Sequence, residues 1–386
     1  MKGKRGMMVV VLGALLAALM FCAPVQAAET IKVGAILSVT GPASFLGAPE
    51  ARTLEMLVDE LNKKGGVNGQ KIELIINDSA ASPEKAFSFA KQLIEENKVF
   101  AIIGPSTSGE TMKIKSVAEE GKTILLSCAA AEVIVNPVAK YVFKTPQKDS
   151  DAIVKIFQQM KIMKISKIGV LSSNTGFGQA GKAQIEKLAP DHGIKLVANE
   201  VYDKAASDLT AEVTKVKAAG VEAILNWSIE PAQSIVIKNA RQIGFKGPIF
   251  QSHGFGNIKY VEAAGPAAEG VLFPAGRLLV ADVLPKKHPQ RALLIKYKKD
   301  YESKYKEDAS TFGGHAYDAL IILVKAIEKA GKADKEAVRT AIEQLTGVVG
   351  TGGVFNFSAT DHNGLNIDAF EMLTVKKGKF AILKQK

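Results

Sequence analysis

Residues Val99–Ser127, with the sequence VFAIIGPSTSGETMKIKSVAEEGKTILLS, contain the pattern that decides the fold. The apolar runs Val99–Ile103 and Thr123–Ser127 have the length of buried strands, and Ser108–Glu120 between them has helical periodicity. A helix that connects two such strands places them in parallel, with a right-handed crossover. We therefore expect a parallel sheet here.

The same alternation continues on both sides of this stretch. Before it, strands are predicted at Ile31–Leu37 and Lys71–Asn77, and helices at Glu50–Lys64 and Ser82–Asn97. A second series begins after Gln147, with strands predicted at Lys167–Leu171, Lys195–Val201, Ala223–Asn226, Pro248–Gln251 and Gly270–Phe273, and helices at about Ser150–Met160, Gln179–His192, Leu209–Ala219 and Ala232–Ile243. Two such series predict an α/β protein with two doubly wound parallel-sheet lobes.

The C-terminal third has too few elements for a third lobe. Helices are predicted at Pro289–Lys304, Gly314–Ala330 and near Asp334–Leu345, and strands near Val354 and at Phe370–Val375. We expect these segments to return over the two lobes, so that the chain crosses between the lobes several times. Multiple crossings of this kind act as a hinge.

The first residues have the pattern of a secretory signal peptide. Basic residues at positions 2, 4 and 5 precede the apolar run Met7–Phe21, and Val25-Gln26-Ala27 places small residues at the cleavage positions. The run is shorter than the ~20 residues of a membrane-spanning helix, so we expect cleavage after Ala27 and export. Lipidation of Cys22 is the alternative, although the residue before it is a bulky phenylalanine.

The composition is that of an ordinary globular protein. Of the 386 residues, 47% are hydrophobic and 23% charged, which excludes disorder, collagen and a disulfide-dense mini-protein. Loss of residues 1–27 removes three basic residues and no acidic one, so the formal net charge falls from +11 to +8. This charge suits an anionic ligand or a membrane-facing surface, and equally lysines scattered over helix faces.

Only Cys128 remains after that cleavage, so no disulfide can form within the mature chain. We interpret Cys128 as a small buried apolar residue, with redox sensitivity as the alternative.

One strand-end loop has the chemistry of an anion site. Ligands of open parallel sheets bind beyond the carboxyl ends of the strands, where Gly104–Glu110 lies. The hydroxyls of Ser106, Thr107 and Ser108 stand beside free backbone amides at a helix start, which suits a carboxylate. Thr107 and Glu110 also match a capping box, so a purely structural role stays open.

Loops of the second series supply further candidates. Gly176–Lys182 matches the start of a phosphate-binding loop, but Ala183 stands where a metal-binding Ser or Thr is needed, so we expect Phe177 to begin a helix over a cleft instead of nucleotide binding. Trp227 follows a buried strand and suits a cleft or a core position equally. His253 lies in a loop after the next strand, where a structural role is common.

No constellation of residues points to catalysis. The sequence has no Gly-x-Ser-x-Gly elbow, the mature chain's one cysteine lacks the local signature of a nucleophile, and the histidines have no metal-ligand spacing. We therefore expect neither a cofactor, nor a metal, nor nucleic-acid binding, and we predict a binding protein that is not an enzyme.

These segments together resemble the periplasmic leucine/isoleucine/valine-binding protein family, the solute-binding components of ABC importers. Each match is weak alone, but their order and spacing are specific and they extend over nearly the whole mature chain. The matching stretches are Ile31–Pro42 (IKVGAILSVTGP), Asp59–Gly69 (DELNKKGGVNG), Ile103–Gly109 (IGPSTSG), Val221–Gly244, Ala267–Gly270 (AAEG), Ala316–Leu320 (AYDAL) and Gly353–Gly364 (GVFNFSATDHNG).

The resemblance implies a type I periplasmic binding protein, in which two lobes joined by three crossings close over a ligand. It implies lobe one at residues 28–146 plus 277–355 and lobe two at 147–276 plus 356–386. In the family, loops matching Ser106–Ser108 and Ala129–Ala131 hold the carboxylate and the ammonium of an amino acid, and second-lobe residues close over it. The site implied for this chain consists of Ser106, Thr107, Ser108, Ala129, Ala131, Phe45, Phe177, Trp227, Ile229 and His253.

This sequence departs from the amino-acid pattern of the family at three places. Ala131 stands where the family often has a threonine, and His253 aligns with the acidic residue that pairs with the ligand ammonium. The aromatic residue of the first loop falls near Leu46, with Phe45 adjacent. An unpaired ammonium in a dry cleft costs several kcal/mol, so we predict a carboxylate ligand without an α-ammonium, such as an aromatic acid, unless Glu230 replaces the missing acid.

The resemblance also implies partners. A monomer that captures a small molecule and delivers it to an ABC permease is expected. The alternative is a binding module that signals to a membrane receptor.

Overall fold

The computed structural model describes residues 30–384. The predicted signal peptide and Cys22 lie outside these residues. Within the described range, no helix is both long enough and apolar enough to cross a membrane.

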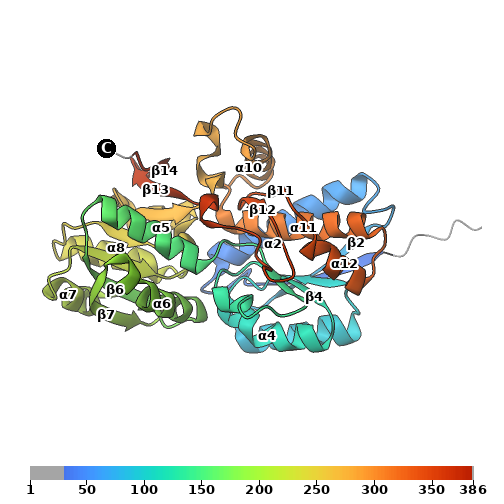
Figure 1. The fold of residues 1–386 in the computed structure, drawn as a ribbon, viewed down its shortest axis with the longest axis horizontal. Coiled ribbons are helices and arrows are strands. Elements are labelled where there is room, and N and C mark those ends of the chain that lie inside the picture. The colour runs from blue at the N-terminus through green and yellow to red at the C-terminus, as the bar shows by residue number, and fades with distance from the viewer. Residues whose placement is uncertain (1–29, 385–386) are drawn as a thin grey trace, which may run out of the picture.

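Five parallel strands form the first sheet, in the order β2-β1-β3-β4-β5. Its strands are β1 (Ile31–Leu37), β2 (Ile72–Asp78), β3 (Ala101–Ile103), β4 (Ile124–Ser127) and β5 (Val142–Lys144), and its helices are α2 (Ser44–Lys63), α3 (Pro83–Lys91), which continues as η2 (Gln92–Glu96), and α4 (Ser108–Glu120), followed by the short η3 (Glu132–Ile134). We call this sheet and the helices packed on it lobe one, on the right of Figure 1.

Alternation along β1 explains why lobe one has helices on both faces of its sheet. Val33, Ala35 and Leu37 pack into one apolar cluster with residues of α2, whereas Ile36 packs into another with residues of α3 and α4. Successive side chains of a strand point to opposite faces, so a strand with apolar residues at every position is buried on both sides.

The second sheet repeats the order of the first. Its strands run β7-β6-β8-β9-β10, all parallel, and β13 and β14 then extend it beyond β10 in antiparallel fashion. The strands are β6 (Lys167–Ser173), β7 (Lys195–Tyr202), β8 (Ala223–Trp227), β9 (Ile249–Gln251), β10 (Leu272–Ala275), β13 (Glu371–Lys376) and β14 (Lys379–Ile382). The helices are α5 (Asp149–Ile162), α6 (Gly176–Leu188), η4 (Pro190–His192), α7 (Thr210–Ala218), α8 (Ala232–Gln242), η5 (His253–Phe255), α9 (Ile258–Ala264) and η6 (Gly265–Ala268). This is lobe two, on the left of Figure 1.

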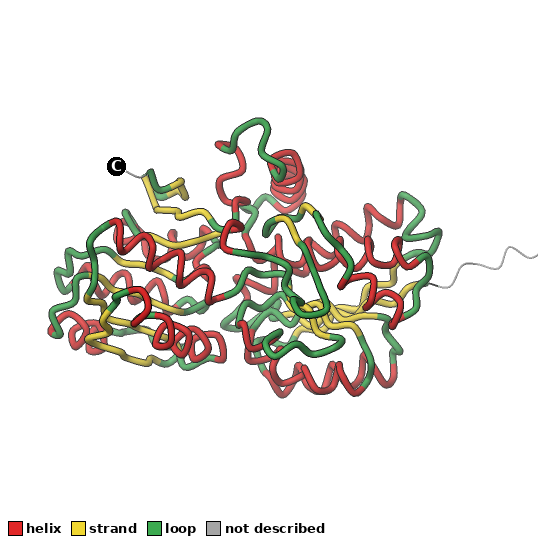
Figure 2. The backbone as a smooth tube through the Cα atoms, viewed as in Figure 1, coloured by secondary structure: helices red, strands yellow, loops and turns green. Residues whose placement is uncertain are grey.

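The C-terminal third returns to both lobes, as the sequence predicts. It contains η7 (Arg277–Val283), α10 (Arg291–Tyr305), α11 (Thr311–Ala330), α12 (Lys335–Glu343), the strand pair β11 (Val348–Val349) and β12 (Val354–Phe355), and η8 (Ile367–Ala369) before β13. Helix α11 packs against α2 in lobe one, while β13 pairs with β10 in lobe two. The chain therefore crosses between lobes after β5, after β10 and before β13, as the tube in Figure 2 allows one to follow. The residue boundaries given above for the lobes stay a prediction.

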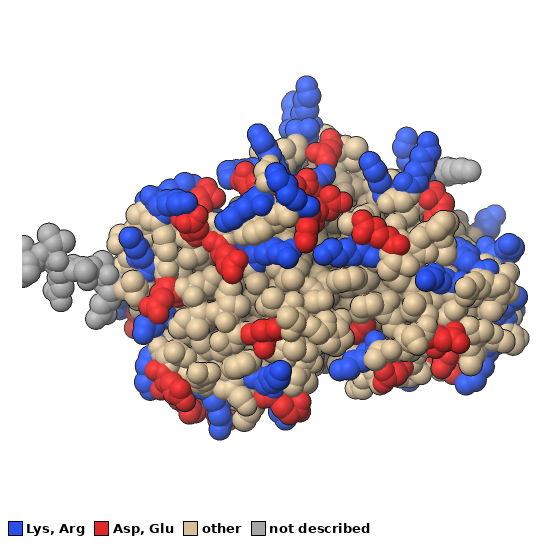
Figure 3. All heavy atoms as spheres, turned by 180° about the vertical axis from the view of Figure 1, so that it is seen from behind, with Lys and Arg blue, Asp and Glu red and all other residues tan. Residues whose placement is uncertain are grey.

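Helix α10 projects from the body of the protein beside these crossings (Figure 1). It packs on η7 through a small apolar cluster that includes Leu278, Leu294 and Tyr301. Figure 3 shows charges of both signs across one face of the molecule, with Lys and Arg side chains gathered on this projection. Part of the excess of basic over acidic residues therefore lies on this projection and not between the lobes.

Helix α2 begins at Ser44, six residues before the predicted start at Glu50. Pro49 lies inside the helix and cannot donate a backbone hydrogen bond to the carbonyl of Phe45. The Nδ2 of Asn257, in lobe two, donates to that carbonyl at 2.9 Å. A tertiary contact therefore supplies the hydrogen-bond donor that the Phe45 carbonyl lacks because of Pro49. The local sequence gives no sign of this contact.

Several further elements differ from the predictions: β11, β14 and α9 were not predicted, and α11 begins at Thr311 instead of Gly314. Strand β5 was not predicted, because three residues that end in a lysine show no usable periodicity. Helix α6 begins at Gly176 instead of Gln179, because the Oγ1 of Thr175 accepts the backbone N–H of Gly178 at 3.3 Å and caps the helix there.

Candidate functional site

A narrow cavity with a free volume of ≈ 20 Å³ lies between the two lobes. Lobe one supplies residues at the ends of β3 and β4, and lobe two supplies residues after β6, β8 and β9. The lining residues are Leu46, Ser106, Ser108, Cys128, Ala129, Ala130, Pro146, Phe177, Ile229, His253, Gly254, Phe312 and His315. A wider hollow of ≈ 320 Å³ shares Phe177 and Ile229 with the cavity and includes Thr107 and Glu230.

The serine loop of lobe one is held by its own hydrogen bonds. The Oγ of Ser108 accepts the backbone N–H of Ala131 at 3.3 Å, which ties the two strand-end loops together. Thr107 caps α4, since its Oγ1 accepts the backbone N–H of Glu110 at 3.4 Å and donates to the Glu110 carboxylate at 2.6 Å. The structural interpretation of Thr107 therefore applies, and Thr107 lines the outer hollow and not the cavity.

Ser106 stands in front of a buried carboxyl group. Its Oγ accepts the backbone N–H of Ser38 at 3.0 Å and is hydrogen-bonded to Glu50. Complete burial raises the pKa of Glu50 to about 8, against the opposing effect of the Ser106 hydrogen bond, and Glu110 raises it further. Near neutral pH Glu50 therefore keeps its proton, so the Ser106 hydroxyl donates to a neutral carboxyl group and no buried carboxylate lies behind it.

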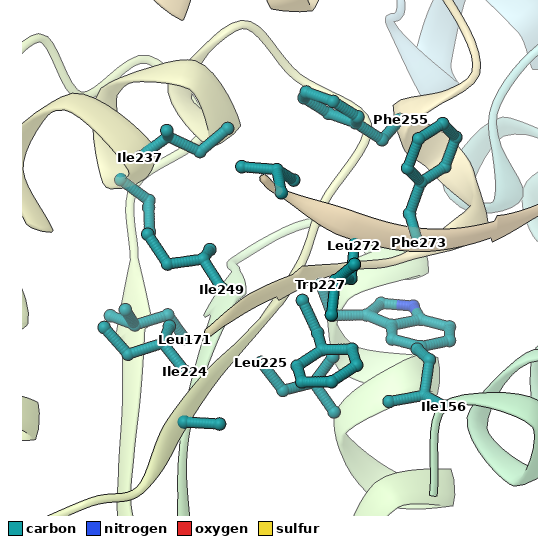
Figure 4. Packing of buried hydrophobic residues seen from close by; sticks show 14 of the residues in the cluster. Ile156, Leu171, Ile224, Leu225, Trp227, Ile237, Ile249, Phe255, Leu272 and Phe273 are labelled. Atoms are coloured by element: carbon teal, nitrogen blue, oxygen red, sulfur yellow. The ribbon is translucent and has the colours of Figure 1, made fainter. Parts of the chain in front are cut away.

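Lobe two presents aromatic rings. Phe177, in the first turn of α6, stacks on Trp227 with ring centroids 5.6 Å apart and an angle of 28°. Trp227 ends β8 and is completely buried, and Figure 4 shows its indole within the packed core near Ile156. Trp227 is absent from the residues that line the cavity, so it supports Phe177 from behind.

His253 lies among three aromatic side chains. Phe177, Trp227 and Phe370 each approach its ring edge-on, with centroids 5.5, 5.6 and 5.6 Å away. Neither ring nitrogen has a hydrogen-bond partner within the described residues. Burial, the positive charge of Lys144 and His315 together lower the pKa of His253 well below its usual value, so the ring is neutral.

Glu230 does not replace the missing acid in the cavity. Its carboxylate accepts hydrogen bonds from the Ser228 hydroxyl at 2.7 Å and from the backbone N–H of Ile229 at 3.2 Å. The carboxylate is therefore hydrogen-bonded within its own loop. It lines only the outer hollow. Among the residues that the structure describes, no acidic side chain lines the cavity.

The structure brings six of the ten predicted residues to the cavity lining and separates the other four. Thr107 and Trp227 are placed as described above, and Ala131 is buried in a core cluster of lobe one. Phe45 packs edge-on against Tyr260 of lobe two, with centroids 5.3 Å apart, and its neighbour Leu46 lines the cavity instead.

Sequence reasoning missed Phe312 and His315, which both lie near the start of α11. Ser310 caps the start of α11. Gly313 and Gly314 allow this helix start to pack closely against other segments of the protein. A Cβ added to Gly313 would lie 2.4 Å from the Tyr297 hydroxyl oxygen, and one added to Gly314 would lie 2.6 Å from the Thr351 hydroxyl oxygen. That pair of glycines is the signal that could have placed this helix start against other elements.

The lobes touch at the starts of α4 and α6. A Cβ added to Gly176 would lie 2.8 Å from the Cα of Gly109, whereas one added to Gly109 would have its nearest neighbour at 3.9 Å. Near the crossing, the carboxylate of Asp149 accepts the backbone N–H of Glu132 at 3.1 Å. Together with the bond from Asn257 to Phe45, these contacts hold lobe two against lobe one.

The cavity offers both polar and apolar contacts to a small molecule. Hydroxyls and imidazoles supply its polar contacts, rings and aliphatic side chains supply the rest, and within residues 30–384 no cluster of side chains suits a metal ion. Its free volume of ≈ 20 Å³ is far below the ~300–1,000 Å³ typical of small-molecule sites, so a ligand needs the lobes further apart than they are here.

Comparison with known proteins gives a consistent answer. Residues 30–379 match the family model described as periplasmic binding protein. The leucine-, isoleucine-, valine-, threonine-, and alanine-binding protein of Pseudomonas aeruginosa is 29% identical over 332 residues, which cover 85% of this chain and 86% of the relative.

Solved structures share the whole architecture. An extracellular ligand-binding receptor from Rhodopseudomonas palustris HaA2 has a TM-score of 0.87 and 25% identity, covering 92% of this chain and 99% of that chain. A solute binding protein of an ABC transporter from Rhodopseudomonas palustris BisB5, in complex with 3,4-dihydroxy benzoic acid, has a TM-score of 0.79, with 91% of this chain and 95% of that chain covered; at 19% identity it shows the fold alone. The resemblance drawn from the sequence is confirmed: the chain belongs to the periplasmic binding protein family, in its branched-chain amino acid type.

Proposed function

We propose that this protein captures a small carboxylate that lacks an α-ammonium group and delivers it, as a monomer in the periplasm, to an ABC permease. One observation carries the choice of ligand: the described lining of the cavity contains hydroxyl and imidazole groups but no carboxylate. The relative from Pseudomonas aeruginosa is named for amino acids, so the proposal departs from that name on chemical grounds.

The serine loop supports a carboxylate at one side of the cavity. Ser106 and Ser108 line it at the start of α4, where the helix dipole favours negative charge. Glu50 is neutral near pH 7 and lies behind Ser106, so it does not repel an anion there. Hydrogen bonds to a charged group are worth about 1.5–3 kcal/mol each.

An α-ammonium group would find little compensation in the same cavity. The residue that aligns with the acid of amino-acid binders is His253, which is buried and neutral, and Glu230 is bonded within its own loop. Burying a charge without a partner costs several kcal/mol. Since a methylene in an apolar pocket is worth only about 1–3 kcal/mol, a good side-chain fit does not offset that cost.

Transport then needs no bond chemistry. A ligand that contacts both lobes favours the closed state, because the open state lacks half of those contacts. Lobe one offers the serine loop, and Phe177, Ile229 and His253 close over the ligand from lobe two. The closed pair of lobes is the shape that a permease recognises.

Two molecules that differ only at the α-carbon test the proposal. Leucine and its keto acid, 4-methyl-2-oxopentanoate, have the same side chain, and phenylalanine and phenylpyruvate form a second pair. Isothermal titration calorimetry should show each keto acid, or a simple aromatic acid, binding at least about tenfold tighter than the matched amino acid. Tight leucine binding with no heat from any of the acids would contradict the proposal.

A further inference from the structure

Two histidines from different elements line the same cavity. His253 lies in η5, after β9 of lobe two, and His315 lies near the start of α11. They are 7% and 6% exposed. Within the described chain, both nitrogens of His253 and the Nδ1 of His315 are buried and have no hydrogen-bond partner. A buried polar group without a partner is unfavourable, so a ligand that hydrogen-bonds to these nitrogens removes that penalty.

A buried positive charge lies near both imidazoles. The Nζ of Lys144, on β5, donates to the backbone carbonyls of Ala130, Pro146 and Gln147 at 2.8, 2.9 and 3.2 Å. Its charge lowers the pKa of His253 and of His315, and His315 also lowers that of His253. Asp149, Glu132 and Asp151 act on Lys144 in the opposite sense, but none of them is among the described residues that line the cavity. The rings packed around His253 do not titrate. This part of the cavity therefore favours negative charge.

Both imidazoles are neutral before a ligand binds. Burial, and then Lys144, lower the pKa of His315 to about 3 and that of His253 well below its usual value. An anion next to an imidazole raises the pKa of the ring, so a bound anion that offsets burial and the charge of Lys144 lets the ring take up a proton. Serine hydroxyls do not gain a proton when an anion binds. Of the two polar sides of the cavity, only the histidine side can therefore take up a proton with the ligand.

We propose that the ligand carries two anionic groups, one bound by the Ser106–Ser108 loop and the other by His253 and His315, and that binding takes up a proton from solvent. The ligand class is thus a small dicarboxylate, aliphatic or aromatic. The inference rests on the proposed function, which supplies the first carboxylate. It goes further by assigning His315, which no sequence signal had marked, to ligand selection.

The test uses pairs of acids that differ by one terminal carboxylate: 2-oxopentanoate against 2-oxoglutarate, and benzoate against terephthalate. Titration calorimetry near pH 6, in two buffers of unequal ionisation enthalpy, measures both affinity and proton uptake. We expect one diacid to bind roughly tenfold tighter than its monoacid, with net uptake of protons. The advantage should shrink as the pH rises toward about 8. Ionisation of Glu50 near that pH weakens both members of a pair and so cancels in their ratio. Burial lowers the pKa of Lys144 to about 8, so its loss of charge adds to the trend with pH, and the proton uptake measured near pH 6 is what assigns the effect to the histidines.

Substitution separates the histidines from general effects. His315→Gln keeps a hydrogen-bond donor but cannot gain a charge, so it should remove most of the diacid advantage, measured as the ratio of diacid to monoacid affinity in the same variant, together with the proton uptake. His192→Gln is the control, because His192 packs on Phe157 away from the cavity. Proton uptake by the unmodified protein needs no variant, so the test stands even if His315→Gln destabilises the fold.

The outcomes distinguish this inference from the proposed function. Equal affinity for mono- and diacids, or a diacid advantage without proton uptake that persists in His315→Gln, overturns the two-anion ligand and leaves the carboxylate carrier intact. Binding of leucine with no binding of any acid overturns both.

Discussion

Lobe one and lobe two have the same order of parallel strands, yet they offer the cavity different chemistry. Lobe one presents Ser106 and Ser108, which are fixed by hydrogen bonds to Glu50, Ser38 and Ala131. Lobe two presents rings and an imidazole whose nitrogens have no partner among the described residues. The shared topology decides where loops lie, and the residues in each loop decide what that side binds. The polar side is therefore ready to orient a ligand, while the aromatic side selects its shape.

The largest expected effect comes from removing the support of the aromatic side. Trp227→Ala should lower the free energy of unfolding by about 3–5 kcal/mol, since a fully buried indole is lost from the core and Phe177 loses its stacking partner. Urea denaturation measures the change. Phe45→Ala, which removes a half-buried ring at the edge of lobe two, is the control and should cost less. Equal losses would mean that Trp227 has no special structural role.

The buried acid of the polar side should make stability depend on pH. The Glu50 pKa is about 8 in the folded protein and near 4.5 when exposed, so its neutral form stabilises the fold fully below pH 4.5 and this effect is lost as pH rises toward 8. Glu50→Gln should remove a pH-dependent loss on the order of 2–4 kcal/mol between about pH 5 and 8. The difference between the two unfolding curves isolates Glu50 from Asp318 and Asp149, whose pKa values are also raised. Parallel curves for the two proteins would rule this account out.

The contact between the lobes can be blocked from one side only. Gly176→Ala should weaken binding of the preferred acid at least about tenfold, because its Cβ meets the backbone of Gly109 at 2.8 Å when the lobes are together. Gly109→Ala is the matched control, since its Cβ has space there. Small-angle scattering with saturating ligand should show compaction for the control and less for Gly176→Ala. The same compaction in both variants would show that closure does not depend on this contact.

The smallest effect should come from the hydrogen bond between Asn257 and the Phe45 carbonyl. Asn257→Asp keeps the acceptor that caps α9, at 3.0 Å from the backbone N of Lys259, but loses the donor to Phe45. We expect a loss of affinity of roughly fivefold, equivalent to one hydrogen bond of about 1 kcal/mol, with little change in stability. Calorimetry and thermal melting measure the two quantities. A fall in melting temperature without a change in affinity would assign the bond to folding alone.

The sheets could be predicted from the sequence because their information is local. Strands such as Ile31–Leu37 are buried and nonpolar at every position except Lys32, and Ser108–Glu120 was predicted with its observed bounds. The start of α2 could not be predicted, since Pro49 leaves the Phe45 carbonyl without its helical donor and Asn257, more than 200 residues away in the sequence, donates to it instead. Local patterns cannot register a contact of that range.

The candidate site was predictable on the side where hydroxyls mark a helix start. Ser106, Ser108, Phe177 and His253 all reach the cavity lining. His315 was missed because a lone histidine in an apolar helix has no signature of its own, and only the tertiary fold shows which face of α11 meets lobe two. The structure places Leu46, and not the predicted Phe45, in the cavity lining. A shift of one residue along a helix cannot be resolved from residue propensities.

The contact between Gly109 and Gly176 has a consequence for which bound molecules can be transported. Two bare backbones form a mechanical stop, so the lobes halt at one separation whenever the trapped molecule is small enough to let them meet. The outer contour of the loaded protein is then independent of the cargo. A molecule that binds tightly but is too large for Gly109 and Gly176 to come into contact would occupy the protein without being transferred to the permease. Such a molecule would inhibit import.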